Sequence, residues 1–475
     1  MPSAAIDFPL TTSPGLLATE TGGRLINAIV EKAPDGSRSP VIFRRAPGLT
    51  SLHKPQAGIP RGALAVGGIL YLVIGDMVHT VTRSGGTYVS SVLTGTVPGS
   101  GRVMMARNMR APQPQILIQH DLGLSKIEGG TVSNFSDPDL PATNSLGFID
   151  GFFIATTAQG RAYASGVNDT TFNELDYATA EASPDGLVRA IAMRQDLLLM
   201  GETTVEFWSN AGNATGFPFT RSHVLPVGLL APFAVAGHET GFPDPLMWVG
   251  NNGVVYRLSG YSPERVSSTQ LERMILAEPN PAVLEATVFV SAGRSFWSLT
   301  SPNWTWVYDM TAGSWSERQS YGEPNWRVSI CANALDRWLA FDAMTAEIFA
   351  IDDRNPREGD QPLLFEVRSN VMHRFPGRFS ISKASFDFAT GVGVDRGISP
   401  VETDPRVSIS WSDDGGVSFS TALLRELGQQ GEQQRIDVWR TGLTGRQGRQ
   451  WRLQCSDPVD VVLMGGAMDF EARGA

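Results

Sequence analysis

The chain has 475 residues, including 50 glycines and 30 prolines, and only 18% of its residues are charged, which is typical of a turn-dense, β-rich protein. A chain of this length should contain two or more domains. The formal net charge of −10 argues against a general grip on nucleic acid, although it allows a wall past which DNA slides.

Three further features of the sequence narrow the class of protein to which the chain can belong. No run of roughly 18 uninterrupted apolar residues occurs, so we expect no transmembrane helix and no membrane insertion. The first seven residues lack the basic region and apolar core of a signal peptide. Cys331 and Cys455 are far apart, which indicates reduced core residues of a protein made in the cytoplasm.

The first 60 residues form a polar lead that carries several prolines and glycines. Two strand candidates lie in it, at 16–20 and 25–30, and each either joins a later sheet or reaches toward a partner. We therefore describe residues 1–60 as an extended, partner-contacting lead.

Residues 61–355 contain seven copies of one pattern, a four-residue apolar run, a short turn and a second strand-like run that is usually amphipathic. Runs that are apolar on both faces suit strands buried between neighbouring sheets, and the alternating second run suits a half-solvated strand. The apolar runs begin at residues 71, 116, 152, 197, 246, 296 and 338, which places successive copies 36 to 50 residues apart.

One four-stranded propeller blade takes ~40–50 residues, so this spacing predicts an all-β fold with a seven-bladed β-propeller, six blades being possible. The alternative is a β-sandwich with irregularly spaced hairpins, which would rarely repeat so evenly. Between the fifth and sixth copies, Thr269 and Glu272 form a predicted capping box that opens a helix over 270–277, and Pro279 and Pro281 end it. This helix either packs on a neighbouring blade or fills a loop.

A charged stretch with proline and glycine marks the next boundary, and we assign 356–361 as a linker. Beyond it the strand candidates alternate more strictly. About six strands in about 110 residues predict a C-terminal β-sandwich over 362–475. The candidates are 363–368, 382–388, 407–411, 436–439, 451–454 and 459–464.

Catalytic signatures are missing from the sequence. It has no zinc-type HxH or HExxH spacing, no GxSxG elbow and no phosphate-binding GxxxxGK[ST] loop. Asp76, Asp196 and Asp342 lie beside hairpin turns, where carboxylates usually cap backbone amides. We therefore expect no enzyme activity, no cofactor and no metal site. The scattered histidines are His53, His79, His120, His223, His238 and His373.

One motif favours a glycan-related reading. Ser412, Asp414, Gly416 and Phe419 fit the Asp-box pattern S-x-D-x-G-x-x-aromatic of sialidase propellers. Asp-boxes stabilise hairpin turns and do not perform catalysis, and here the match occurs once, outside the repeats. A glycan-binding or sialidase-like propeller is therefore the alternative function.

A basic cluster lies near the C-terminus, where five arginines are interleaved with tryptophans. Such a cluster suits contacts to phosphate or to an acidic protein surface, and the alternative is a hairpin with a basic solvent face. We expect its arginines to be exposed and predict that they form an assembly interface. The cluster comprises Arg435, Arg440, Arg446, Arg449 and Arg452 with Trp439 and Trp451, and the interface candidates are Arg440, Arg446, Arg449, Arg452 and Trp439.

The order of several short motifs resembles the packaged-DNA stabilisation proteins, or tail hubs, of short-tailed bacteriophages. The resemblance spans about residues 40–470, and the first 40 residues match nothing in that family. The motifs are RAPGL at 45–49, SPDGLV at 183–188, TVEFWSN at 204–210, GLLAP at 228–232, WVGNNGVVY at 248–256, the helix at Glu272, the turn at 412–419 and GRQGR at 445–449.

This resemblance implies a structural virion protein of the phage tail, assembled in the host cytoplasm. Six copies would form a ring below the portal and its adaptor ring, extend and close the DNA channel, and seat the tail needle and the fibre or spike proteins. DNA would pass through the lumen without sequence-specific binding. A cytoplasmic scaffold of the WD type would carry a GH…WD pair in each blade, which this sequence lacks.

Overall fold

A computed structural model describes residues 2–15, 20–37, 39–180, 186–213, 215–393 and 400–473. Most of the strand candidate at 16–20, and residues 183–185 of the SPDGLV motif, lie outside this part of the chain. Strands dominate, which confirms the predicted all-β class. Contacts divide the chain into two compact units. Unit 1 is Met1–Thr50, Ser291–Trp326 and Ile351–Ala475, and unit 2 is Ser51–Val290 and Arg327–Ala350.

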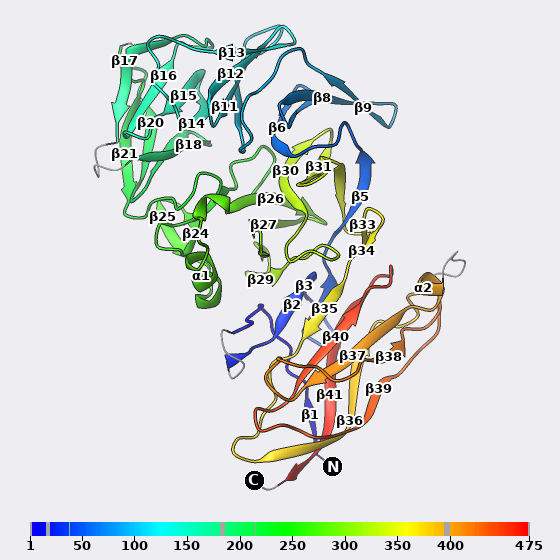
Figure 1. Ribbon diagram of the computed structural model, residues 1–475. Helices are drawn as coiled ribbons and strands as arrows, with labels where there is room; N and C mark the ends of the chain where they lie inside the picture. Colours follow the sequence, from blue (N-terminus) through cyan, green and yellow to red (C-terminus); the bar gives the residue numbers. More distant parts are fainter. Residues whose placement is uncertain are drawn as a thin grey trace. The chain divides into compact units, whose positions relative to one another are not determined.

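Unit 2 contains five separate four-stranded antiparallel sheets in chain order, followed by a further sheet (Figure 1). The first three are β6 (Pro60–Val66), β7 (Ile69–Ile74), β8 (Met77–Ser84) and β9 (Thr87–Val92); β10 (Met104–Arg107), β11 (Ile116–His120), β12 (Gly123–Glu128) and β13 (Thr131–Phe135); and β14 (Ser145–Ile149), β15 (Phe152–Thr156), β16 (Arg161–Ser165) and β17 (Phe172–Thr179).

The next two sheets are β18 (Leu187–Met193), β19 (Asp196–Gly201), β20 (Val205–Asn210) and β21 (Phe219–Leu225); and β22 (Val235–Ala236), β23 (Met247–Val249), β24 (Val255–Ser259) and β25 (Ser262–Arg265). Strands β30 (Val328–Ala334), β31 (Arg337–Asp342) and β32 (Ile348–Asp352) form the further antiparallel sheet. The chain passes between the units four times, within β5 (Gly48–His53), β26 (Glu285–Ser291) and β32, and between Trp326 and Arg327.

All seven predicted hairpins are present. Each apolar run lies in the first strand of an antiparallel pair, and the run after the turn lies in the second strand. Tight turns join them: Gly75, for example, lies between β7 and β8 and has a φ of 56°, a backbone that glycine adopts without steric cost. The pairs are β7–β8, β11–β12, β15–β16, β19–β20, β23–β24, β31–β32, and β27 (Arg294–Ser301) with β28 (Trp304–Asp309).

Successive sheets of unit 2 pack face to face through shared apolar clusters. Side chains of each of the first four sheets pack against those of the next sheet in chain order. The last sheet packs back onto the first, where Leu339 and Phe341 of β31 lie against Leu70 and Leu72 of β7. Each such fully buried side chain contributes about 1.5–3 kcal/mol. This arrangement is propeller-like, as predicted.

Two local expectations in the repeats are wrong. The second strand of a pair is less amphipathic than predicted, because neighbouring sheets cover both of its faces, as for Glu206 and Phe207 of β20, which are both buried. The helix α1 (Thr269–Leu276) begins one residue before the predicted start, and Ser268 caps it by accepting from the amide of Leu271. Thr269 is therefore no cap, and the carboxylate of Glu272 binds Arg265 instead. A short 3-10 helix, η2 (Pro281–Val283), follows.

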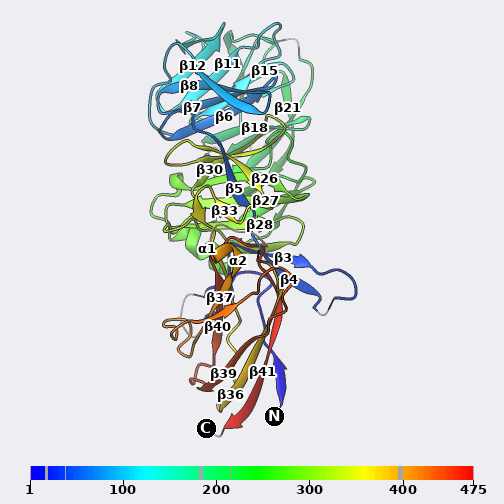
Figure 2. The same ribbon diagram turned by 90° about the vertical axis from the view of Figure 1, so that its right-hand side faces the viewer.

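Unit 1 is built from two sets of hydrogen-bonded strands, whose long members lie side by side (Figure 2). The first has the order β3 (Ala28–Lys32), β4 (Val41–Arg45), β41 (Val462–Arg473), β36 (Arg378–Phe388) and β39 (Ile436–Leu443), with β1 (Ser3–Ala5) also on β41. The second continues from β27 and β28 through β29 (Ser314–Glu317), β2 (Arg24–Ile26), β35 (Phe365–Arg368), β40 (Gln450–Cys455), β37 (Arg406–Ser412) and β38 (Leu423–Glu426).

The remaining elements of unit 1 are short. They are β33 (Arg357–Glu358) and β34 (Gln361–Pro362), which pair with each other, and α2 (Pro400–Thr403). The six predicted C-terminal strands are confirmed as β35, β36, β37, β39, β40 and β41, although β36 and β41 run well beyond the predicted limits. Strand β38 was not predicted. Buried side chains of both strand sets form one core, in which Trp451 of β40 meets Phe386 of β36 edge to face.

The lead joins these sheets. Strand β1 pairs with β41, β2 with β35, and β4 with β41. Arg45, from the RAPGL motif, is buried and donates to the backbone carbonyls of Cys455, Asp457 and Val459 at 2.9–3.1 Å. The described strands of the lead therefore join later sheets, which is the first of the two alternatives predicted for it. The boundaries predicted for the lead, the linker and the two domains stay a prediction.

Candidate interaction surfaces

The turn after β37 contains the Asp-box-like residues. The Oγ atom of Ser412 donates to Oδ1 of Asp414 at 2.7 Å and accepts from the amide of Gly416 at 2.8 Å. The amide of Ser418 donates to both carboxylate oxygens of Asp414, at 3.0 and 3.1 Å, and its hydroxyl donates to Oδ2 at 2.5 Å. These bonds lower the pKa of Asp414 to about 2, so the carboxylate is held as an anion within its own turn.

Two arginine side chains lie against the ring of Phe419, the aromatic residue of this motif. The guanidinium carbon of Arg452 lies 3.9 Å from the ring centroid, and that of Arg368 lies 5.2 Å away. Arg452 also donates from Nε to Oγ of Ser410 at 3.0 Å, and burial lowers its pKa. Arg452 is thus partly covered and held against the Asp-box-like turn by a cation–π contact.

Arg449 is not exposed, so the expectation of an exposed arginine is wrong at this position. It is only 1% exposed and forms a bidentate ion pair with Asp413, at 2.8 and 2.7 Å. It also donates to Oγ1 of Thr441 at 2.6 Å, and its guanidinium lies 5.3 and 5.9 Å from the rings of Trp411 and Trp451. Arg449 therefore fastens the end of β39 and the entry to β40 onto the Asp-box-like turn.

Three of the five interface candidates remain at the surface. Trp439 is 61% exposed, with Nζ of Lys383 lying 4.9 Å from its ring centroid. Arg440 is exposed at an irregularity between β36 and β39, where its φ is 58°. Arg446 is exposed in the loop that follows. Their role as an assembly interface stays a prediction, and Arg435 is exposed nearby.

No group of three or more His, Cys, Asp or Glu side chains that could hold a metal ion occurs within the described ranges. The carboxylate of Asp342 accepts from the amide of Met344 at 3.0 Å, which is the turn-capping role expected of it. Asp196 instead accepts from the hydroxyls of Ser209 and Tyr261, at 3.3 and 3.2 Å.

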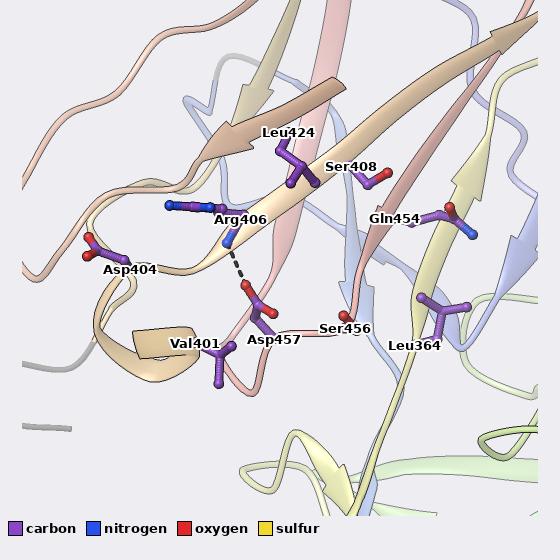
Figure 3. A pocket seen from close by; sticks show the side chains of 9 residues that line it. All are labelled: Leu364, Val401, Asp404, Arg406, Ser408, Leu424, Gln454, Ser456 and Asp457. Atoms are coloured by element: carbon purple, nitrogen blue, oxygen red, sulfur yellow. Dashed lines mark hydrogen bonds between the residues drawn. The ribbon is translucent and has the colours of Figure 1, made fainter. Parts of the chain in front are cut away.

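Unit 1 contains a pocket that sequence reasoning missed (Figure 3). Its volume is about 380 Å³, and the backbone amide of Arg406 donates to Oδ2 of Asp457 at 2.7 Å across its wall. The lining comes from distant parts of the chain, so no local motif could have revealed it. The lining residues are Leu364, Val401, Asp404, Arg406, Ser408, Leu424, Gln454, Ser456 and Asp457.

A second missed feature is Phe375, which is 84% exposed. It lies in a tight turn before β36, where a bridge joins Arg374 to Gly377. The local signal was available, because an aromatic residue between arginine and Pro-Gly is typical of a turn tip. Of the helices in the part of the chain that the structure describes, none is long and apolar enough to cross a membrane.

The face-to-face succession of four-stranded antiparallel sheets defines a β-propeller-like protein. A family model described as "Bacteriophage P22 Gp10, beta-propeller" matches residues 25–356, which is more than half of the chain. The chain therefore belongs to this family of phage stabilisation proteins, and the resemblance found from its motifs is confirmed. As a member of this family, it is a phage tail protein involved in stabilisation and is part of the virion.

Three solved structures are similar to the chain at low identity. The WD40 β-propeller domain of Doa1 is 11% identical with a TM-score of 0.41, and the match covers 64% of this chain and 96% of that domain. U3-55K is 10% identical with a TM-score of 0.42, covering 65% and 100%. The computationally designed Ika8 protein is 10% identical with a TM-score of 0.39, covering 65% and 100%. No curated protein matches.

Proposed function

We propose that six copies of this protein form a ring below the portal and its adaptor ring, where they extend and close the DNA channel and keep the packaged genome from leaking. The observation that carries this proposal is the family match over residues 25–356. In the same proposal, the other side of the ring seats the tail needle and the fibre or spike proteins.

A seven-bladed propeller and a C-terminal β-sandwich are the architecture we propose for this role. Seven antiparallel hairpins, one in each repeat, support the blade count. The core shared by the two strand sets of unit 1 supports the sandwich. Propellers are rigid and have variable loops, which suits the building of rings and the mounting of partners.

Electrostatics supports a passive conduit. Six copies, each with a formal charge of −10, would carry six times −10, or −60. A ring with this net charge would repel the phosphate backbone, so DNA would slide through without binding. Closure is then steric and only weakly dependent on salt, unlike binding driven by counterion release.

We also propose that the protein is not an enzyme. The Asp-box-like turn uses the carboxylate of Asp414 to accept hydrogen bonds within the turn, which is a structural use of that residue. Sialidase, esterase and nuclease assays should therefore show no turnover. Robust turnover that is lost on changing Asp414 would favour the glycan-related alternative.

The test of the proposed function is to assemble particles without this protein and to follow encapsidated DNA by its sensitivity to nuclease. Heads should fill to normal length and then lose their DNA, and purified protein should restore retention when it is added back. Heads that stay full but fail to adsorb would indicate a host-recognition role instead. Heads that never fill would place the protein in packaging and contradict the proposal.

A further inference from the structure

The turn before β36 presents an apolar knob with a basic surround. Phe375 is 84% exposed at its tip, and bridges between Arg374 and Gly377 and between Met372 and Arg449 hold the turn in place. The exposed His373 and Arg374 immediately precede Phe375. The backbone of the knob is therefore held in place by the fold, although the Phe375 ring is not packed into the protein's own core.

The pocket in unit 1 has the opposite character. Leu364, Val401 and Leu424 give it an apolar lining, and Val401 and Leu424 are 41% and 57% exposed. Its volume of about 380 Å³ lies near the lower end of the roughly 300–1,000 Å³ of pockets that hold a small ligand, so it suits one large side chain.

Acidic groups dominate the charge around this pocket. Asp404 and Asp457 line it, and both are carboxylates. Arg406 is the basic residue of the lining, and its guanidinium lies 3.8 Å from the carboxylate of Glu426. The rim is thus acidic where the turn at Phe375 is basic, and two such surfaces attract each other.

The knob and the pocket lie at opposite ends of unit 1. The turn at Phe375 precedes the first residue of β36, and α2, which carries Val401, follows the far end of that strand. Eleven residues at about 3.3 Å each make β36 roughly 36 Å long. Figure 1 shows the yellow turn before β36 and the orange α2 at the two ends. One copy therefore cannot place its own Phe375 in its own pocket.

We propose that the Phe375 knob of one copy docks into the Val401–Leu424 pocket of the next copy. The contact is head to tail, and such contacts generate closed rings when the rotation between copies closes. An aromatic side chain in an apolar pocket, ringed by complementary charges, is a typical interface hot spot. This inference rests on the proposed function, since it names the contact through which copies of the chain assemble.

A cross-linking experiment tests the contact on the full chain. One preparation carries His373→Cys, which keeps Phe375, and the other, with a different tag, carries Ser456→Cys in the pocket lining; both positions are exposed, and the native Cys331 and Cys455 are buried. After a short thiol-reactive cross-linker is added, the mixture should give a cross-linked pair that carries both tags. Neither preparation alone should give it. An assembled mixture without this product would overturn the proposal.

Substitutions supply the second readout, self-association measured by sedimentation. Phe375→Ser should weaken it at least about tenfold, because the anchor is lost while an exposed residue contributes little to folding. Leu175→Ser in unit 2 is the matched control, since Leu175 is 70% exposed and lies outside both surfaces. Arg374→Glu should also weaken association, and adding Asp404→Arg should restore it.

The outcomes separate this inference from the proposed function. If Phe375→Ser associates like the unchanged chain, or if the unchanged chain stays monomeric at every concentration, the proposed contact is wrong. Particles that retain DNA despite Phe375→Ser would likewise overturn the contact and leave the proposed function standing. A specific cross-link in a protein whose removal does not release DNA would instead support the contact and contradict the proposed function.

Discussion

Replacing Arg449 by methionine should destabilise unit 1 strongly. Methionine fills much of the space between Trp411 and Trp451 but leaves the carboxylate of Asp413 without its bidentate partner. Removing one member of a buried ion pair costs about 3–5 kcal/mol. The side chain of Asp413 is one-third exposed and can regain water, so we expect a cost near the lower end, about 3 kcal/mol.

Urea unfolding followed by tryptophan fluorescence measures this loss, because Trp411 and Trp451 flank the substituted side chain. At an m-value of about 2–3 kcal/mol/M, the midpoint of unit 1 should fall by roughly 1 M. Arg446→Met is the control, and its effect should stay within about 0.5 kcal/mol, because Arg446 is exposed.

Adding Asp413→Asn to Arg449→Met should recover part of the lost stability, because the unpaired charge is then removed as well. Equal midpoints for Arg449→Met and Arg446→Met would refute the reasoning. They would show that Arg449 acts as a solvated charge despite its burial.

Three further predictions concern stability. The pKa of Asp414 is lowered from 3.8 to about 2, so the stability that its carboxylate gives the fold is fully present above pH 3.8 and is lost as the pH falls through about 2. Asp414→Asn should remove that part of the acid unfolding, measured by fluorescence. Burial lowers the pKa of buried His79 below 6.5, so the stability gained from holding this histidine neutral is present above pH 6.5 and is lost as the pH falls through the lowered pKa. In thermal melts below pH 6.5, His79→Leu should therefore make the melting temperature less dependent on pH. A melting temperature with unchanged pH dependence would contradict this. Ser268→Ala should cost about 1 kcal/mol in urea unfolding, whereas Thr269→Ala should change little, and the reverse order would restore Thr269 as the helix cap.

The repeats could be predicted because their signal is local. A buried strand, a tight turn and a second strand lie within about 15 residues, and each copy carries them, as at 197–208. Two predictions about the repeats were wrong, each for its own reason. The burial of β20 on both faces depends on neighbouring sheets, and the cap of α1 shifted by one residue because Ser268 and Thr269 are both good capping residues.

What the sequence could not reveal depends on pairing between distant residues. Strand β1 pairs with β41, about 460 residues away, and the part of β41 beyond the predicted limit, which starts with Gly465 and Gly466, is a strand because β36 and β1 flank it. Arg449 looked like one arginine of an exposed cluster, yet Asp413 lies 36 residues before it and pairs with it in the fold. The pocket combines four separate segments for the same reason.

An image of the purified particle tests the central claim most directly. The account predicts a ring of six copies of this protein around the DNA channel, immediately below the portal and its adaptor, with DNA density ending at or within the ring. Copies placed away from the channel, for example only on fibres, would contradict it. So would a ring whose lumen is open and empty in particles that still retain their DNA.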